Sequence, residues 1–401
     1  MNLNTTILSQ LLLLIFTLGC SQASKEHVEE SKEASAPVIM AYYVPEREFR
    51  QEEIPVEKLT HIIYSFSNLI DGEMKFGNEE MAGPMLEALV KQKTRNPDLK
   101  VMIACGGWGA DGFSDMALTE ESRAKFIQSS KEFIEKYQLD GMDMDWEYPG
   151  ISGDGTMARE EDTQNFTALM KGLREMLDTF DSHKVLTFAS AGWKRYYDFI
   201  EVNEVMKYAD YTNVMTYDQV SGVSIYTGHH TPLGNVASED IQETPFHAHL
   251  DSLYQEGENL DPDPRSVEKI VDFLIGEGVD PRQIVIGAAF YGRVWKGVPP
   301  VNNGLYQLSE GLHIGWMAYH QIREKYEQDS NFHRFWDEKA KAPYMYNSKE
   351  SLLVSYDDTV SVALKTKYAK EKGIGGIMFW ELGNDTKQEG SLLDAIYKAA
   401  Q

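Results

Sequence analysis

Three acidic residues alternate along one short stretch of the chain, and their types and spacing are suited to chemistry. Asp143, Asp145 and Glu147 occupy every second position of the segment DGMDMDWEYPG, residues 140–150. Successive side chains of a β-strand point to opposite faces, so the three carboxyl groups share one face. Their mutual repulsion and the cost of burying them bring no stability, which indicates a functional role.

The same stretch predicts different chemical roles for these acids. Burial and an ionised neighbour both raise the pKa of a carboxylic acid. A charge on Asp145 or Asp143 would therefore keep Glu147 protonated, as a general acid requires. We predict that Glu147 is the general acid and that Asp145 is its charge and hydrogen-bond partner. Two other interpretations are an exposed edge strand with solvated acids and a carboxylate site for a divalent metal.

The elements that would position these acids alternate regularly after Pro37. Eight short runs rich in apolar, β-branched and aromatic residues predict strands at 38–44, 61–69, 100–107, 141–148, 184–190, 211–217, 284–291 and 375–380. Helix-period segments between them include 123–138, 162–180, 202–208, 266–277 and 360–372. This order predicts an α/β fold, a (β/α)8 TIM barrel whose chemistry lies at the C-terminal ends of its strands. A less regular stretch at about 294–355 predicts a small α+β insertion lobe between strands 7 and 8.

Several motifs resemble one known family. The spacing Asp-x-x-Asp-x-Asp-x-Glu, which ends at Glu147, resembles the signature of glycoside hydrolase family 18, the chitinase family. Other segments resemble that family's motifs in the same order along the chain: Ala104-Cys105-Gly106-Gly107-Trp108, Met215-Thr216-Tyr217-Asp218, Phe290-Tyr291-Gly292-Arg293 and Trp380. The resemblance covers the chain from Val38 to about Ala399.

The resemblance implies retaining, substrate-assisted hydrolysis of β-1,4 bonds between N-acetylglucosamine units in chitin or chitooligosaccharides, with no cofactor and no metal. Glu147 would then protonate the leaving oxygen. Asp145 would turn between Asp143 and Glu147 and stabilise the acetamido nitrogen. Tyr217 would hold the acetamido carbonyl for attack. The resemblance places further substrate contacts at Gly106, Gly107, Trp108, Tyr148, Met215, Asp218, Tyr291, Arg293 and Trp380, the last as the floor beneath the sugar.

Some residues depart from this pattern or stay open. Ala104 stands where the family usually has a serine that supports the inner aspartates, so we expect a different resting charge distribution over them. Trp193 and Trp295 either extend the cleft or pack in the core. Four histidines, in two neighbouring pairs, fall in loop sequence, where solvated side chains are expected rather than a metal site: His229, His230, His247 and His249.

The first residues of the chain predict export. An apolar run at 11–16 is too short to span a bilayer but suits a secretory signal. The Gly19-Cys20 pair after it resembles the end of a bacterial lipoprotein signal. We predict a signal peptide at 1–19, a lipidated Cys20 with a polar tether over 20–37, and a catalytic domain at 38–401. The protein would be lipid-anchored in a bacterial cell envelope, at the outer membrane or in the periplasm, or alternatively secreted.

Charge limits the partners. The 401 residues carry a formal net charge of −25, which argues against nucleic acid and against membrane contact other than through a lipid anchor. The expected ligand is an uncharged glycan that contains N-acetylglucosamine. An endo-β-N-acetylglucosaminidase acting on the chitobiose core of N-glycans would need the same acids, although the predicted lobe favours a chitinase because it deepens the cleft. A non-catalytic surface glycan-binding protein is the other alternative, and Glu147 speaks against it.

Overall fold

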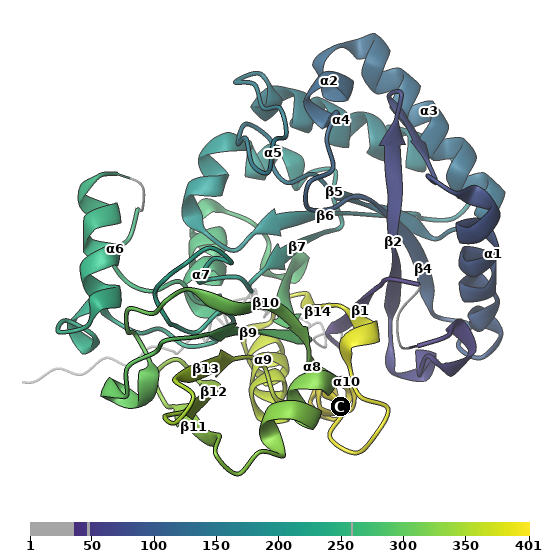
Figure 1. Ribbon diagram of the computed structural model, residues 1–401. Coiled ribbons are helices and arrows are strands. Elements are labelled where there is room, and N and C mark those ends of the chain that lie inside the picture. The colour runs from purple at the N-terminus through teal and green to yellow at the C-terminus, as the bar shows by residue number, and fades with distance from the viewer. Residues whose placement is uncertain (1–35, 46–48, 258–259) are drawn as a thin grey trace, which may run out of the picture. The chain divides into compact units, whose positions relative to one another are not determined.

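The computed structural model describes residues 36–45, 49–257 and 260–401 (Figure 1). The predicted signal peptide, Cys20 and nearly all of the tether lie outside the described residues. None of the helices in the described ranges is long and apolar enough to cross a lipid bilayer.

Eight parallel strands form a closed barrel, which confirms the predicted fold class. They are β1 (Val38–Tyr43), β2 (His61–Ile70), β4 (Lys100–Gly106), β5 (Gly141–Asp145), β6 (Val185–Ala191), β7 (Tyr211–Met215), β8 (Ile284–Ala289) and β14 (Gly376–Trp380). Neighbouring strands pair in the order β1-β14-β8-β7-β6-β5-β4-β2, and the pairing of β1 with β2 closes the ring. A short strand, β3 (Glu73–Lys75), pairs antiparallel with the end of β2.

Helices follow most of the barrel strands along the chain, and α1 and α3 flank β2 and β4 on the outside (Figure 1). The α-helices in the described ranges are α1 (Glu79–Val90), α2 (Phe113–Leu118), α3 (Glu120–Tyr137), α4 (Asp162–Leu177), α5 (Val202–Val205), α6 (Pro245–Gln255), α7 (Val267–Glu277), α8 (Tyr319–Ile322), α9 (Thr359–Lys372) and α10 (Leu392–Ala400). Local chemistry sets their ends. The carboxylate of Asp358 caps α9 by accepting the N–H groups of Val360 and Ser361, and Gly373 ends that helix with φ of 70°.

A second, antiparallel sheet lies between β8 and β14 in the sequence. Its strands are β9 (Tyr291–Trp295), β10 (Leu312–Ala318), β11 (His333–Asp337), β12 (Ala342–Asn347) and β13 (Leu352–Ser355), in the order β10-β9-β13-β12-β11. We call residues 291–355 the lobe. The strand predicted at 284–291 is two elements, because the chain leaves β8 and enters β9 after Phe290 alone.

A buried ion pair holds the chain in place where it leaves the lobe. Lys365 on α9 and Asp357 just after β13 are fully buried, and Lys365 Nζ lies 2.6 Å from Asp357 Oδ2. The same oxygen accepts hydrogen bonds from the Thr231 hydroxyl at 2.9 Å and from the Ala289 N–H at 3.0 Å. Asp357 Oδ1 accepts the Ser361 hydroxyl at 2.6 Å. Both carboxylate oxygens therefore have partners, and α9, the end of β8 and the lobe exit meet at one carboxylate.

The barrel wall separates two packed layers. Outside it, Met144 and Trp146 belong to the large core, where the Trp146 ring stacks on Phe113 at 5.7 Å between centroids. Inside it lies a smaller apolar cluster that includes Tyr42 and Tyr217. Because β5 is buried on both faces, the side of the strand that carries the acids faces this interior.

Candidate active site

The acids of β5 are placed by simple strand alternation. Asp143 and Asp145 lie within the strand and are 0% and 5% exposed, whereas Glu147 follows the strand end and is half-buried. Asp140, the first acid of the motif, lies elsewhere: its carboxylate pairs with Lys93 Nζ at 2.8 Å and accepts the Val101 N–H. The exposed-edge interpretation of this strand is therefore wrong, because the strand is fully inside the sheet.

Asp143 is held by polar side chains from three other strands. Its Oδ2 accepts the Tyr42 hydroxyl at 2.9 Å. Its Oδ1 accepts the Thr187 hydroxyl at 2.5 Å and the Asn213 amide at 3.3 Å. Burial raises the pKa of Asp143 to about 6, and the hydrogen bonds from these three residues limit that rise. Ala104 pairs with Asp143 in the sheet and offers no hydroxyl, but the carboxylate is satisfied without one.

Asp145 differs from Asp143 in having an unsatisfied oxygen. Its Oδ1 is buried and has no hydrogen-bond partner among the described residues. Burial raises the pKa of Asp145 well above its usual range, and repulsion from Glu147 and then Asp143 adds to the effect. A buried carboxyl group with a free oxygen and a raised pKa can hold a proton and form a new hydrogen bond to a ligand.

Glu147 has the pKa that a general acid needs. Burial raises it to about 7, a hydrogen bond with Tyr148 lowers it in part, and the charge of Asp218 raises it further. The sequence predicts that this shift comes from a charge on Asp145 or Asp143. Burial is instead the largest cause, and the repulsion between neighbouring acids raises the pKa of Asp145. Glu147 can thus carry a proton near neutral pH and donate it.

Tyr217 and Asp218 follow β7 and lie beside these acids. Burial and then the charges of Asp145 and Glu147 raise the pKa of Tyr217 well above its usual range, so its hydroxyl stays protonated and able to donate. Asp218 is the opposite case. Burial alone would raise its pKa, but contacts with His230, Arg293 and other groups outweigh burial and lower it to about 2. A neutral donor and a permanent negative charge therefore stand side by side.

Asp218 links the barrel to the lobe. Its Oδ1 accepts the Tyr291 hydroxyl at 2.7 Å and Arg293 Nε at 3.0 Å, both from β9. His230 Nδ1 lies 3.6 Å from the same oxygen, and His230 is fully buried. The prediction of solvated histidines is wrong for His229 and His230, because His229 is also buried and lies 3.1 Å from Asp337 Oδ2.

Aromatic rings form the surface around the acids. The Trp380 ring stacks on Phe66 at 5.5 Å between centroids and lies 5.8 Å from Tyr42. Met215, at the end of β7, is half-buried in the same interior cluster. Trp108, just past the end of β4, is 64% exposed.

The predicted contact residues Gly106 and Gly107 pack against protein. A Cβ on Gly106 would lie 1.9 Å from the Asp145 carbonyl oxygen, and a Cβ on Gly107 would lie 2.9 Å from the Phe66 ring. Both residues have positive φ, 127° and 95°. These glycines therefore allow β4 to approach β5 and Phe66 closely.

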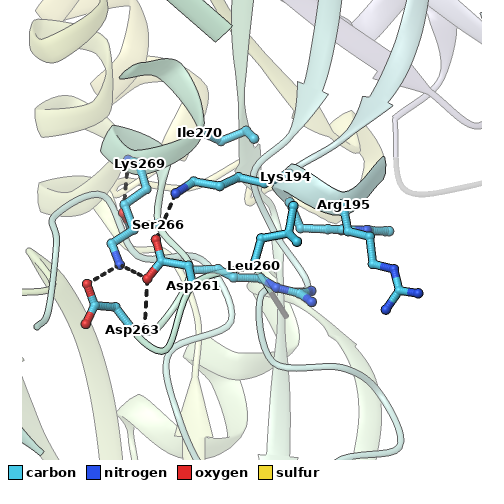
Figure 2. Close-up of a pocket in the computed structure, with 11 residues that line it drawn as sticks. Lys194, Arg195, Leu260, Asp261, Asp263, Ser266, Lys269 and Ile270 are labelled. Carbon is cyan, nitrogen blue, oxygen red and sulfur yellow. Dashed lines mark hydrogen bonds and ion pairs between the residues drawn. The ribbon is translucent and has the colours of Figure 1, made fainter. Parts of the chain in front are cut away.

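A surface pocket lies beside the site, between the chain after β6 and the start of α7 (Figure 2). Asp261 there binds Lys194 Nζ at 2.8 Å and Lys269 Nζ at 3.2 Å. The Trp193 ring borders the pocket and packs edge-on against Tyr148 at 5.3 Å. Trp193 thus lies next to the site, whereas Trp295 is fully buried and donates its indole N–H to the Ser224 carbonyl.

Four residues around the acids were missed by sequence reasoning: Tyr42, Thr187, Asn213 and His230. The first three are polar or hydroxyl-bearing residues within otherwise apolar strands, and this is the signal that could have found them. No group of three or more histidine, cysteine or acidic side chains that could hold a metal ion occurs within the described part of the chain.

Comparison with known proteins decides the family. The family model described as "Glycosyl hydrolases family 18" matches residues 38–385. The chain belongs to this family. Chitinase A1 of Niallia circulans is 36% identical over 312 residues, which are 75% of this chain and 42% of that protein. Chitinase B of Serratia marcescens is 31% identical over 389 residues, 85% of this chain and 76% of that protein.

A solved structure of another family 18 member supports the assignment. The family 18 N-acetylglucosaminidase from Paenibacillus barengoltzii superposes with a TM-score of 0.77 at 35% identity, over 90% of this chain and 99% of that one. This chain spans less than half the length of Chitinase A1 but nearly the whole of the N-acetylglucosaminidase chain. Family 18 membership thus rests on both sequence and fold.

Proposed function

We propose that this family 18 protein hydrolyses β-1,4 bonds between N-acetylglucosamine units of chitin or chitooligosaccharides by a retaining, substrate-assisted mechanism. The observation that carries the proposal is the pair formed by Asp145 and Glu147. Glu147 has a pKa of about 7 and can protonate a leaving oxygen. Asp145 has a buried oxygen that finds no partner among the described residues, suited to the N–H of an acetamido group. The named chitinases among the relatives agree with this substrate.

Each step of the reaction has a residue with the right state. Glu147 gives its proton to the glycosidic oxygen as the bond to the anomeric carbon breaks. The substrate's own acetamido oxygen attacks that carbon, with the Tyr217 hydroxyl holding it in place. Asp145 accepts the acetamido N–H and offsets the positive charge that develops there. Glu147, now a carboxylate, takes a proton from the water that opens the cyclic intermediate, which restores the original configuration.

The decisive variant is Glu147→Gln, which keeps the shape of the side chain and removes its proton. We expect at least a thousandfold lower kcat on chitooligosaccharides with binding largely retained. Glu160→Gln, at an exposed acid outside the site, is the matched control and should keep normal turnover. Wild-type turnover by Glu147→Gln would disprove the mechanism.

Product analysis on two substrates separates the proposed chitinase activity from the alternative functions. Product analysis by mass spectrometry would use a chitooligosaccharide and a high-mannose glycopeptide side by side. Cleavage of the oligosaccharide supports the proposal. Release of the intact glycan with no cleavage of the oligosaccharide would instead identify an endo-β-N-acetylglucosaminidase, and binding without any cleavage would identify a glycan-binding protein.

We also propose that the protein is exported and anchored by lipid at Cys20. The apolar run at 11–16 and the Gly19-Cys20 pair support this. The wild-type protein should partition into detergent after membrane fractionation, and Cys20→Ser should move it to the aqueous phase. Cys105→Ala is the control, because Cys105 is a buried thiol of the barrel core. Aqueous partitioning of the wild-type protein would contradict the anchor and favour secretion.

A further inference from the structure

The turn that follows β7 carries two residues of the site, Tyr217 and Asp218, beyond the end of the strand ladder. β7 pairs with β8 only as far as Val214 and with β6 only as far as Met215. Asp218 has φ of 56°, in the left-handed region that few residues other than glycine adopt. The backbone of this turn therefore depends on hydrogen bonds that the ladder no longer supplies.

The Thr216 side chain supplies such hydrogen bonds on the side of β8. Its hydroxyl donates to the Gly287 carbonyl at 2.7 Å and accepts the Gly287 N–H at 2.8 Å. The side chain thus takes the place of one pairing step between β7 and β8, and it holds the residue directly before Tyr217.

The Gln219 side chain supplies them on the side of β6. It is 8% exposed, and its amide Nε2 donates to the Tyr217 carbonyl at 3.2 Å and to the Met215 carbonyl at 3.4 Å. The Gln219 N–H donates to the His230 carbonyl at 3.0 Å. Gly192, which follows β6, leaves room for this amide, because a Cβ there would lie 2.4 Å from Nε2. One side chain thus bridges the turn from its far end back to the strand.

Folding stability does not account for the Gln219 amide. Its Oε1 is buried and has no hydrogen-bond partner among the described residues. Turning the amide over would not satisfy that oxygen, because Oε1 would then face two carbonyl oxygens, which cannot donate. A buried amide oxygen without a partner costs free energy. That cost is explained if the amide is needed to hold one particular shape of the turn.

We propose that Gln219 is a positioning residue for Tyr217, whose hydroxyl holds the acetamido carbonyl for attack. The amide fixes the Tyr217 carbonyl and thereby the direction in which the Tyr217 side chain leaves the turn. A misplacement of about 1 Å can slow such a step by about a hundredfold. A looser turn therefore lowers the rate of the chemical step more than it weakens binding of the glycan. This inference rests on the proposed function.

The test is a double-variant cycle with a chitooligosaccharide as substrate. Gln219→Met should lower kcat about tenfold and change KM less than about twofold. In a Tyr217→Phe background the hydroxyl to be positioned is gone, so adding Gln219→Met should lower kcat less than about twofold further. Losses that multiply in the double variant, or wild-type turnover by Gln219→Met, would overturn the inference. Wild-type turnover by Tyr217→Phe would instead count against the role of Tyr217 in the proposed function.

Further variants separate positioning from folding. Gln307→Met is the matched control, because Gln307 is a 5% exposed glutamine of the lobe whose Nε2 donates to the Leu305 carbonyl at 3.0 Å. Its kcat should not change. Gln219→Leu should reproduce the loss of kcat, and both Gln219 variants should unfold at or above the wild-type midpoint temperature, since the unpaired oxygen is removed. A lower midpoint, together with an equal loss of chitooligosaccharide binding when Gln219→Met is added to Glu147→Gln, would show a structural role and overturn the inference.

Discussion

Two of the buried carboxylates in the described part of the chain, Asp357 and Asp145, have opposite surroundings. Asp357 beneath the lobe exit has a lysine, two hydroxyl groups and a backbone N–H around its two oxygens. Asp145 in the barrel mouth has two acids as neighbours, and one of its oxygens has no hydrogen-bond partner within the described part of the chain. The first site is arranged for stability, and the second keeps an unsatisfied group ready for a ligand. The comparison shows one buried carboxylate whose charge is compensated and another, at the end of β5, whose charge is not.

The largest expected effect on stability is at Asp357, whose charge is compensated by Lys365. Lys365→Met leaves Asp357 buried without its cation, and this should lower the free energy of unfolding by about 3–5 kcal/mol. Chemical denaturation followed by fluorescence measures it. Lys372→Met on the same helix is the control, because Lys372 and Asp272 are 38% and 58% exposed. That variant should cost less than about 1 kcal/mol. Equal losses of unfolding free energy from the two variants would contradict the predicted difference between a buried and an exposed ion pair.

Glu147→Gln should change the stability of the protein in the opposite direction. The pKa of Glu147 is about 7 in the folded chain and near 4.5 otherwise, so the folded state binds a proton that the unfolded state lacks between these values. Raising the pH through that window therefore lowers the stability of the wild-type protein. At pH 8 the variant should be more stable by about 1–3 kcal/mol, and at pH 4 the difference should vanish. A variant less stable at pH 8 would contradict this.

The pH dependence of activity should follow the protonation of Glu147. We expect kcat/KM to fall above pH 7 as Glu147 loses its proton, measured on a chitooligosaccharide across buffers of constant ionic strength. Asp218→Asn removes a charge that raises this pKa, so the alkaline limb should move to lower pH by about half a unit to one unit. A limb that stays in place would show that Asp218 does not act on Glu147 through its charge.

The smallest effect should come from Thr187. Thr187→Val removes a hydrogen bond that lowers the pKa of Asp143, and we expect a stability loss of about 1 kcal/mol. The pKa of Asp143, followed by carbon-detected NMR, should rise above 6. Thr187→Ser keeps the hydroxyl and should leave both quantities near their wild-type values. A pKa of Asp143 that is unchanged in Thr187→Val would contradict the role of this contact.

Strand periodicity made one part of the site predictable. The alternation around Asp143, Asp145 and Glu147 is a local property, so it places all three acids on one face before any tertiary structure is known. The order of apolar runs likewise predicts the barrel and places Tyr217 and Trp380 at strand ends. Both inferences depend only on residues close in the sequence or on the count of elements.

The environment of Asp143 was not predictable in this way. Tyr42, Thr187 and Asn213 come from β1, β6 and β7, and they reach one carboxylate because of the stagger between strands. A sequence does not show that stagger. His230 was missed for a related reason: its burial depends on Tyr291 and Ser355 of the lobe, which lie far along the chain. The division of the predicted strand into β8 and β9 at Phe290 was also not predictable, because the apolar run continues through this residue.

The path of the chain through Phe290 has a kinetic consequence. Entry to the lobe is a single residue between β8 and β9, and its exit is held by the Lys365–Asp357 pair. With so short an entry and a buried ion pair at the exit, we expect the lobe to have little freedom to swing away from the barrel. We then expect a bound glycan to leave by breaking its own contacts at the barrel mouth, without movement of the lobe. Residence time should then grow with the number of sugars bound, while the turnover of short chains is limited by bond cleavage.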